Sequence, residues 1–299
     1  MNALTLKHLR YFEALAAHRH FGRAAEACAI SQPALSLQIK ELEGIMGGPL
    51  VERAAREIRL TAMGEDLLAR GAEILQQVED LNGLVRRQEG PFSGRLRLGV
   101  IPTVAPYLLP RVIHALAHRY PNLKLEPKET ITQSLVVEIL ASRLDAAIVA
   151  LPVTESALQE FSLFDEEFLL VRPAGYAGEP APSAAVLPTM ELLLLEEGHC
   201  FRDQALSFCD AANTPPRQIM EGSSLSTLVQ MVSAGIGVTL IPEMARNFET
   251  RSANVDVAHF AENPPRRTIG MIWRKTNPLS HDLMEIGAII RKVAEVANG

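Results

Sequence analysis

The chain has 299 residues, 47% of them hydrophobic, and three cysteines. That is enough apolar material for two or three domains and too few thiols for a disulfide framework. The formal net charge of −6 argues against a protein that coats nucleic acid along its whole length. The apolar runs are far shorter than the ~20 residues that span a bilayer, and the N-terminus lacks the apolar stretch of a signal peptide. We therefore expect a cytoplasmic protein with no membrane partner.

The first 60 residues are predicted to form three short helices and a small wing. They contain eight Lys/Arg and six Glu, a net charge of +2, which leaves −8 on the other 239 residues. Ser31 is placed to cap the third helix, which buries Leu35, Ile39 and Leu42. Helices in this order suit a helix-turn-helix, with a strand-like segment at Glu57–Leu60 as the wing beside the phosphates. The pattern alone also fits a small helical subdomain with solvated charges.

The stretch FGRAAEACAISQPALSLQIKELEGIMGGPLVERAAREIRLTAMGEDLL resembles the winged helix-turn-helix of the LysR-type transcriptional regulators. The similarity includes the Ser-Gln-Pro-Ala-Leu-Ser turn into the third helix and the Leu-Thr-x-x-Gly that follows the wing. It implies a DNA-binding domain over residues 1–60 with double-stranded DNA as its partner. It also implies that Gln32, Pro33 and Ser36 meet bases or phosphates in the major groove and that Arg53 reaches the minor groove.

Residues 61–89 are predicted to form a linker and dimerisation helix. No proline occurs between residues 64 and 88, and apolar or small residues recur in alternating steps of four and three, as in a heptad seam. The members of this seam are Leu67, Gly71, Ile74, Val78, Leu81 and Val85. The alternative is an amphipathic helix that packs on its own chain. The segment QEGPFSGR then predicts the end of the helix and a hinge.

From Leu96 onward, strand-like runs alternate with helical patterns, which predicts a largely parallel α/β body with ligands at strand-to-helix junctions. The LysR resemblance implies a two-lobed effector domain over residues 90–299 that is similar to periplasmic binding proteins. Lobe I would comprise about 90–162 and 268–299, and lobe II about 163–267. Thr103 and Thr132 stand at two junctions, where each hydroxyl either caps a helix or meets a polar ligand.

Two of the three cysteines lie in the segment LEEGHCFRDQALSFCDAAN. If Asp203 starts a helix, the nine-residue offset separates Cys200 and Cys209 by roughly 13 Å, whereas a disulfide joins Cα atoms within about 7 Å. A disulfide would therefore require the segment to refold and would then hold the refolded form. His199, Arg202 and the helix N-terminus each favour a thiolate at Cys200.

Three other interpretations of this segment are open. Both thiols are packing residues in the first of them. A zinc site would use His199, Cys200 and Cys209, but it lacks a fourth ligand and the usual short cysteine spacing, so we expect no metal and no cofactor. A thiol peroxidase would have no use for the DNA-binding head, and we therefore expect that the protein is not an enzyme.

The segments GVIPTVAPYLLP, GHCFRDQALSFC and PRRTIG are similar to the hydrogen-peroxide-sensing branch of the LysR-type regulators, within a resemblance that runs over about residues 6–291. It implies that hydrogen peroxide is the signal, that Cys200 is the peroxidatic residue and that Cys209 is the resolving one. The other residues expected at the peroxide pocket are Thr103, Thr132, His199, Asp203 and Arg267. Thr130 is a rival of Thr132 for the pocket hydroxyl.

We therefore expect a homotetrameric transcriptional regulator, a dimer of dimers, that controls oxidative-stress genes through a reversible Cys200–Cys209 disulfide. Its partners would be promoter DNA, hydrogen peroxide and RNA polymerase. The alternative is a LysR-type regulator whose inducer is a small metabolite bound between the lobes.

Overall fold

The computed structural model describes residues 3–53, 58–86, 94–176, 179, 183, 187, 189–210, 218–261 and 264–295. Within these ranges the side chains of some residues, including Arg53 and residues 207–210, are not described. The chain forms two compact units, Met1–Val85 and Arg86–Gly299, which we call the head and the effector unit. Most of the predicted hinge falls outside the described residues.

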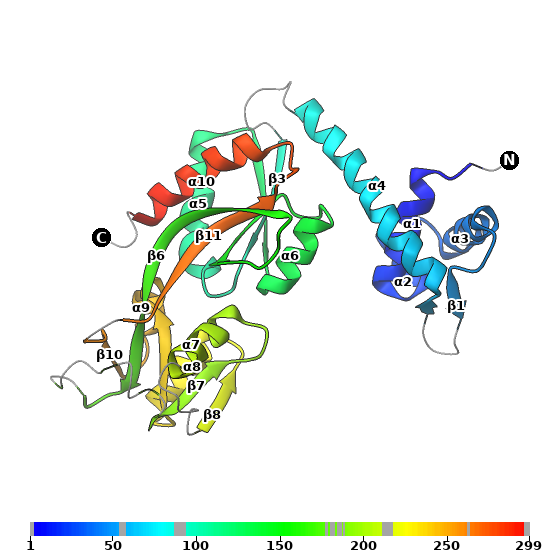
Figure 1. Ribbon diagram of the computed structural model, residues 1–299. Coiled ribbons are helices and arrows are strands. Elements are labelled where there is room, and N and C mark those ends of the chain that lie inside the picture. Colours follow the sequence, from blue (N-terminus) through cyan, green and yellow to red (C-terminus); the bar gives the residue numbers. More distant parts are fainter. Residues whose placement is uncertain are drawn as a thin grey trace. The chain divides into compact units, whose positions relative to one another are not determined.

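The head contains the three helices and the wing that the sequence predicts (Figure 1). Ser31 caps the third helix, because its hydroxyl accepts a hydrogen bond from the amide of Ala34. Leu35, Ile39 and Leu42 on that helix are fully buried, and the two wing strands pair antiparallel. The elements are α1 (Leu6–His18), α2 (Phe21–Ala27), α3 (Gln32–Met46), β1 (Val51–Arg53) and β2 (Ile58–Leu60).

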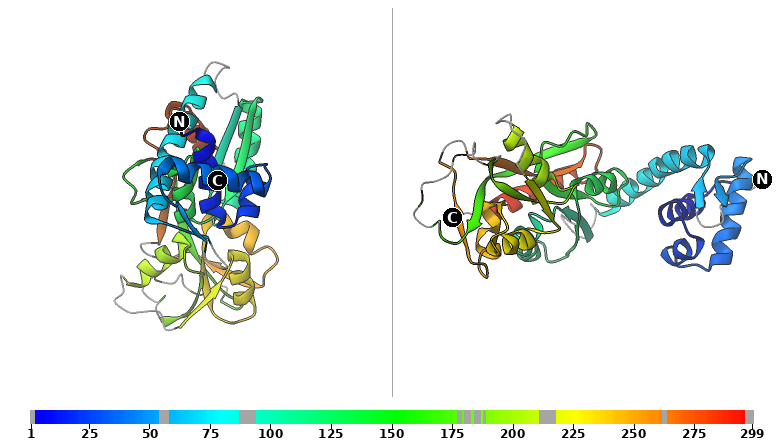
Figure 2. Two further views of the ribbon diagram at one scale, coloured as in Figure 1. Left: turned by 90° about the vertical axis from the view of Figure 1, so that its right-hand side faces the viewer. Right: turned by 90° about the horizontal axis from the view of Figure 1, so that it is seen from below.

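The predicted long helix is α4 (Ala62–Arg86), which is seen along its length in Figure 2. Its first turns pack on the other helices of the head, since Leu67 and Leu75 are buried in the head core. A Cβ added at Gly71 would lie 3.2 Å from a leucine side chain of α1. Leu67 and Gly71 of the predicted seam therefore pack within the chain. Further along the helix, Leu81 is 61% exposed.

The effector unit alternates strands and helices, which confirms the α/β class. No described helix of the chain has the length and apolar character needed to cross a membrane. The helices are α5 (Ala105–Arg119), α6 (Thr132–Leu140), α7 (Cys200–Asp210), α8 (Leu225–Ser233), the 3-10 helix η3 (Glu243–Ala245), α9 (Arg246–Glu249) and α10 (Ser280–Glu295). The strands are β3 (Gly94–Val100), β4 (Leu123–Glu129), β5 (Ala146–Leu151), β6 (Leu158–Pro173), β7 (Glu191–Leu195), β8 (Gln218–Gly222), β9 (Val238–Pro242), β10 (Val255–Ala258) and β11 (Arg266–Arg274).

One sheet of mixed direction extends through both lobes in the order β4-β3-β5-β11-β6-β9-β7-β8. β3 is parallel to β4 and β5, and β7 is parallel to β8 and β9. The prediction of a largely parallel sheet is wrong at β6 and β11, which lie side by side and antiparallel to each other (Figure 1). β6 is also antiparallel to β9, and β11 is also antiparallel to β5. The chain leaves lobe I along β6 and returns along β11, so these two strands must run in opposite directions.

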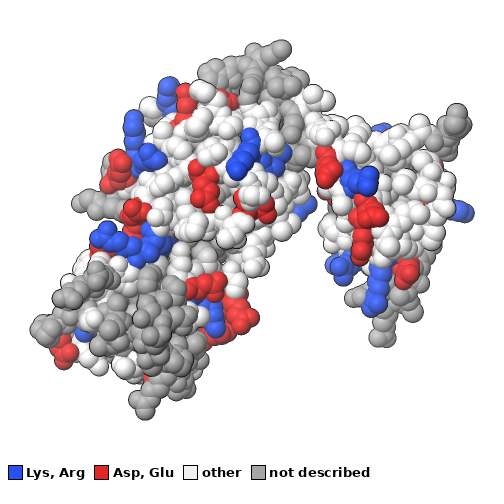
Figure 3. All heavy atoms as spheres, in the orientation of Figure 1, with Lys and Arg blue, Asp and Glu red and all other residues white. Residues whose placement is uncertain are grey.

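Each lobe has its own hydrophobic core. Buried residues of β3, α5, β5, β11 and α10 form the core of lobe I, with Trp273 fully buried. Residues of β6, β7, α7, α8 and β9 form the core of lobe II, which also takes in Tyr107 from α5. Basic and acidic side chains occur close together on both the head and the effector unit in the face drawn in Figure 3.

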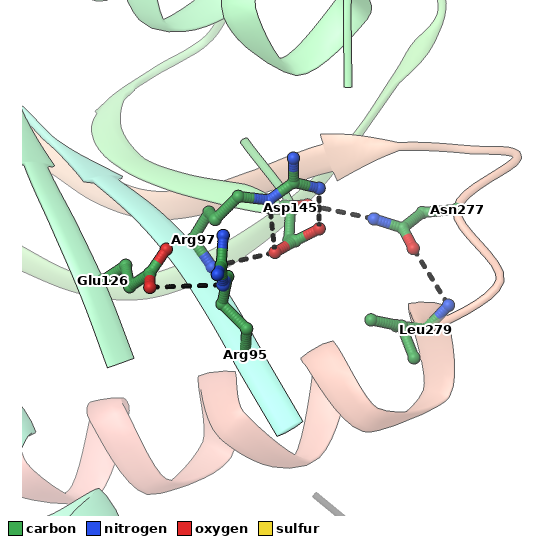
Figure 4. Close-up of polar contacts among 6 residues, drawn as sticks. All are labelled: Arg95, Arg97, Glu126, Asp145, Asn277 and Leu279. Atoms are coloured by element: carbon green, nitrogen blue, oxygen red, sulfur yellow. Dashed lines mark hydrogen bonds and ion pairs between the residues drawn. The ribbon is translucent and has the colours of Figure 1, made fainter. Parts of the chain in front are cut away.

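A polar cluster fastens β3 to the rest of lobe I (Figure 4). The guanidinium Nη2 of Arg97 lies 2.7 Å from Asp145 Oδ1, and the Arg97 amide donates to Oδ2 at 2.8 Å. Asn277 donates from Nδ2 to the Asp145 carbonyl at 3.0 Å and accepts from the Leu279 amide at 2.9 Å. Asp145 and Asn277 are buried, so the cluster joins β3 to the start of β5 and to the turn before α10.

We predict that Asp145→Ala destabilises lobe I far more than Glu126→Ala does. The first change leaves the Arg97 side chain without its carboxylate and should lower the free energy of unfolding by about 2–4 kcal/mol. The second removes only exposed pairs with Arg95 and Lys124, which are worth about 0–1 kcal/mol. Urea unfolding followed by the fluorescence of Trp273, the one tryptophan of the chain, measures both losses. Equal losses would contradict the structural role of the cluster.

Candidate functional site

The turn before Cys200 determines where its thiol lies. Gly198 has a φ of +93°, a left-handed conformation that favours glycine, and a Cβ added there would lie 3.1 Å from Ile131 Cδ1. α7 then begins at Cys200, three residues before the start expected at Asp203. Cys200 itself therefore lies in the first turn of the helix.

Cys209 lies in the same helix as Cys200. Nine residues of α-helix correspond to roughly 13 Å of rise, and the Cα atoms of a disulfide lie within about 7 Å of each other. The backbone of α7 therefore has the geometry on which the predicted conflict between helix and disulfide depends. The side chain of Cys209 lies outside the described residues.

Cys200 borders a cavity of about 640 Å³, which we call the thiol cavity. Thr132 at the start of α6 and Asp203 and Gln204 of α7 contribute polar atoms, and β5 contributes apolar ones. Thr132 Oγ1 is buried and has no hydrogen-bond partner among the described residues, which is unusual for a buried hydroxyl. This oxygen is therefore an unpaired hydrogen-bonding group of a residue that lines the cavity bordered by Cys200.

A second cavity of about 380 Å³ lies between the lobes and is lined by Thr103, Thr130 and His199 among others. We call it the inter-lobe cavity. Tyr107 of α5 and Glu249 of α9 also line it. The Tyr107 hydroxyl donates to Glu249 Oε1 at 2.5 Å and so joins the two lobes. Burial, and the hydrogen bond to Glu249, raise the pKa of Tyr107.

The structure thus divides the residues predicted for one peroxide pocket. Thr132 and Asp203 share the thiol cavity with Cys200, whereas Thr103 and His199 line the inter-lobe cavity. Neither threonine caps a helix: Val104 and Ile131 occupy the N-cap positions of α5 and α6, and neither helix has a side-chain cap.

Arg267 is fully buried beneath this region and joins several of its parts. Its Nε and Nη2 lie 2.8 and 2.6 Å from Glu166 Oε1, and its Nη1 donates to Thr103 Oγ1 at 2.8 Å. Its Cζ lies 5.3 Å from the ring centroid of Phe201, which follows Cys200 in the chain. Arg267 therefore connects both crossing strands, the turn before α5 and the first turn of α7.

No local pattern in the sequence indicated Glu166 as a functional residue. Burial raises the pKa of this carboxyl, and the charge of Arg267 opposes the shift. Three consecutive acidic residues occupy positions 165–167, and only the strand register, which places Glu166 opposite Arg267, selects the buried one. The one available signal was that Glu166 lies two residues before Phe168, and therefore on the same face of the strand.

Arg202, which was expected to favour a thiolate at Cys200, is engaged elsewhere. Its Nη1 lies 2.7 Å from Glu221 Oε1 and donates to the Leu195 carbonyl at 3.0 Å. Of the three groups expected to favour the thiolate, the N-terminus of α7 is the one that Cys200 itself occupies.

The described residues give no support to the zinc interpretation. Among them, no three His, Cys, Asp or Glu side chains come together in a way that would hold a metal ion. His199 lines the inter-lobe cavity and Cys200 lines the thiol cavity.

The residues predicted to contact DNA lie on α3 and β1. Gln32 and Pro33 are exposed, and Ser36 is half-buried. Arg53 ends β1, and its side chain lies outside the described residues. Cys28 follows α2 in the head, and burial raises the pKa of its thiol.

Comparison with known proteins agrees with both units. Residues 6–65 match the bacterial regulatory helix-turn-helix proteins of the LysR family, and residues 89–294 match the LysR substrate-binding domain. A Streptomyces viridosporus protein named "Probable hydrogen peroxide-inducible genes activator" is 41% identical over 292 residues, which are 96% of this chain and 94% of that protein.

The Escherichia coli "DNA-binding transcriptional dual regulator OxyR" is 38% identical over 293 residues, covering 96% of this chain and 95% of the relative. A solved structure of a full-length OxyR variant from Pseudomonas aeruginosa is 34% identical with a TM-score of 0.77, and the match covers 97% of this chain and 96% of that one. These findings confirm the resemblance that the sequence motifs indicated.

We predict that Arg267→Met destabilises the protein in a pH-dependent way. The change leaves Glu166 buried without its cation, which should lower the free energy of unfolding by about 3–5 kcal/mol near neutral pH. Since burial raises the folded-state pKa of Glu166 above its unfolded value, the loss should shrink as the pH falls and the carboxyl takes up a proton, and should grow as the pH rises.

Arg266→Met is the matched control, because Arg266 pairs with Glu167 at the surface, an interaction worth about 0–1 kcal/mol. Urea unfolding at several pH values measures both variants. A pH-independent loss in Arg267→Met would contradict the account of the buried pair.

Proposed function

Because the chain belongs to the LysR family of bacterial regulators, we propose that it is a DNA-binding transcriptional regulator that senses hydrogen peroxide and controls oxidative-stress genes. The observation that carries this proposal is the position of Cys200, in the first turn of α7 and at the edge of a cavity that holds the unpartnered hydroxyl of Thr132. The names of the relatives support the same signal.

The first chemical step is attack of the Cys200 thiolate on one peroxide oxygen. The O–O bond breaks, the sulfur becomes a sulfenic acid, and the other oxygen leaves as hydroxide, which takes up a proton to become water. Thr132 Oγ1 is suited to hold the peroxide by a hydrogen bond, and Asp203 borders the same cavity. Thr103, His199 and Arg267 would then act from the neighbouring inter-lobe region.

In the second step the Cys209 thiolate attacks the sulfenic sulfur of Cys200. A disulfide forms and a second water leaves, so that the two thiols supply the two electrons that reduce the peroxide. Because the helical offset is roughly 13 Å, α7 must unwind between the two cysteines. The disulfide then holds the rearranged segment until a thiol reductant opens it.

Unwinding would carry the signal to the strands that join the lobes. Phe201 directly follows Cys200, is buried, and contacts the Arg267 guanidinium. Arg267 in turn holds Glu166 on β6 and Thr103 before α5. Movement of Phe201 is therefore expected to alter packing at the point where β6 and β11 cross between the lobes.

The head would bind promoter DNA with α3 in the major groove, using Gln32, Pro33 and Ser36, and would reach the minor groove with Arg53. The exposed apolar residues Ile74 and Leu81 of α4 favour pairing of this helix with a second copy. A dimer of dimers in the cytoplasm, acting with RNA polymerase, is the assembly we propose.

Thiol mapping by mass spectrometry before and after a stoichiometric pulse of hydrogen peroxide tests the switch. We predict a peptide cross-linked through Cys200 and Cys209 that dithiothreitol removes. Cys200→Ser should abolish peroxide-dependent transcription, and the control Cys28→Ser should retain it, because burial raises the pKa of the Cys28 thiol and disfavours its reaction with peroxide. Free thiols at both positions after the pulse would refute peroxide sensing.

We also predict that Thr132→Val slows the oxidation of Cys200 by about tenfold, the effect of losing one hydrogen bond to the peroxide. Thr130→Val is the matched control and should leave the rate within about twofold, because Thr130 lines the inter-lobe cavity instead. Stopped-flow measurement of thiol loss under excess peroxide distinguishes the two. The reverse order of effects would make Thr130 the pocket hydroxyl.

The inter-lobe cavity supports a second candidate, a regulator induced by a small metabolite, since its volume of about 380 Å³ suits a small molecule. The carboxylates of Glu129 and Glu249 line it and disfavour an organic anion. Saturable binding of a metabolite by the fully reduced protein, with transcription insensitive to peroxide, would favour this candidate.

A further inference from the structure

The recognition helix α3 carries an apolar side chain that the fold does not use. Leu37 is 65% exposed, the largest exposed fraction of any large apolar residue in the described part of the chain. The head core takes Leu35, Ile39 and Leu42 from the same helix, each fully buried. Leu37 therefore contributes little to the stability of the head, and its place on the recognition helix leaves it able to contact a partner outside the chain.

Helix geometry places Leu37 on the outermost line of α3. At about 100° per residue, it lies roughly 200° around the helix from Leu35, opposite the buried face. Pro33, Lys40 and Gly44 share this outer line at spacings of three and four residues. All three residues permit the close approach of another molecule. At Gly44 the space is open, since an added Cβ would meet nothing within 4 Å.

The carboxylates of α3 make contacts with other groups of the head. Glu43 Oε1 accepts a hydrogen bond from the Leu50 amide at 2.9 Å. Glu41 Oε2 accepts one from Gln38 at 3.1 Å and lies 3.8 Å from His8 Nε2. The outer line around Leu37 therefore bears Lys40, and the carboxylates of Glu41 and Glu43 near it are engaged by groups of the head, which suits a surface that faces phosphates.

We infer that Leu37 is a specificity-determining residue that contacts the 5-methyl group of a thymine in the major groove, an inference that rests on the proposed DNA-binding function. The thymine methyl is the apolar feature that base pairs present in this groove, and it is read by apolar side chains. Gln32 and Ser36 supply hydrogen-bonding groups to neighbouring base edges, whereas Leu37 can make only apolar contacts. The protein should therefore prefer a T·A pair at one position of each half-site.

The experiment uses the full-length protein and a site selected from a pool of random double-stranded DNA. Each thymine of the selected site is replaced in turn by deoxyuridine, which removes the methyl group and keeps every hydrogen-bonding atom. With the wild type, we expect replacement of one thymine in each half-site to lower the affinity about three- to tenfold. Replacement of the other thymines should leave the affinity unchanged. Leu37→Ala should bind thymine DNA more weakly by a similar factor and should be insensitive to the deoxyuridine replacement at that position.

Leu37→Met, which keeps an apolar side chain, should retain most of the affinity and of the methyl dependence. Val137→Ala is the matched control, because Val137 is 57% exposed in the effector unit and lies outside the head. The inference is overturned if no thymine of the site is sensitive to loss of its methyl, or if Leu37→Ala keeps the same sensitivity. Failure of the wild type to select any sequence would instead refute DNA binding itself, and the inference with it.

Discussion

The buried ion pair between Arg267 and Glu166 is the interaction on which the arrangement of the effector unit depends. Removing two charges from water is costly, and the pair is tolerated because each partner makes a further hydrogen bond. Arg267 donates to Thr103, and Glu166 accepts from the Met244 amide. Its members belong to the two strands that cross between the lobes. The buried pair therefore joins the two crossing strands to the turn before α5.

The second constraint is the geometry of α7. A helix and a disulfide impose incompatible distances on Cys200 and Cys209, so in the proposed switch the segment would have two alternative folds and oxidation would select between them. The first turn of the helix is held by burial of Phe201 against Phe168 and Arg267, with ring centroids of the two phenylalanines 4.7 Å apart. Because these contacts adjoin the crossing strands, the proposed refolding of α7 would also disturb the packing of those strands.

Glycines matter where parts of the chain approach closely. Gly198 turns the chain so that His199 and Cys200, although adjacent, border separate cavities. In the head, Gly71 lets α4 lie against α1. The seam that the heptad pattern suggested is therefore shared between the chain's own core and a surface that is exposed further along the helix.

Local patterns in the sequence determined the helices of the head, the cap at Ser31, the positions of most strands and the distance conflict between the two cysteines. Each of these depends on residues within a few turns of one another, and periodicity records such relations directly. Tertiary structure alone decided the direction of β6 and β11, the division of the predicted pocket between two cavities and the pairing of Arg267 with Glu166. The members of that pair are 101 residues apart, and the sequence near each of them carries no record of the strand register that brings them together.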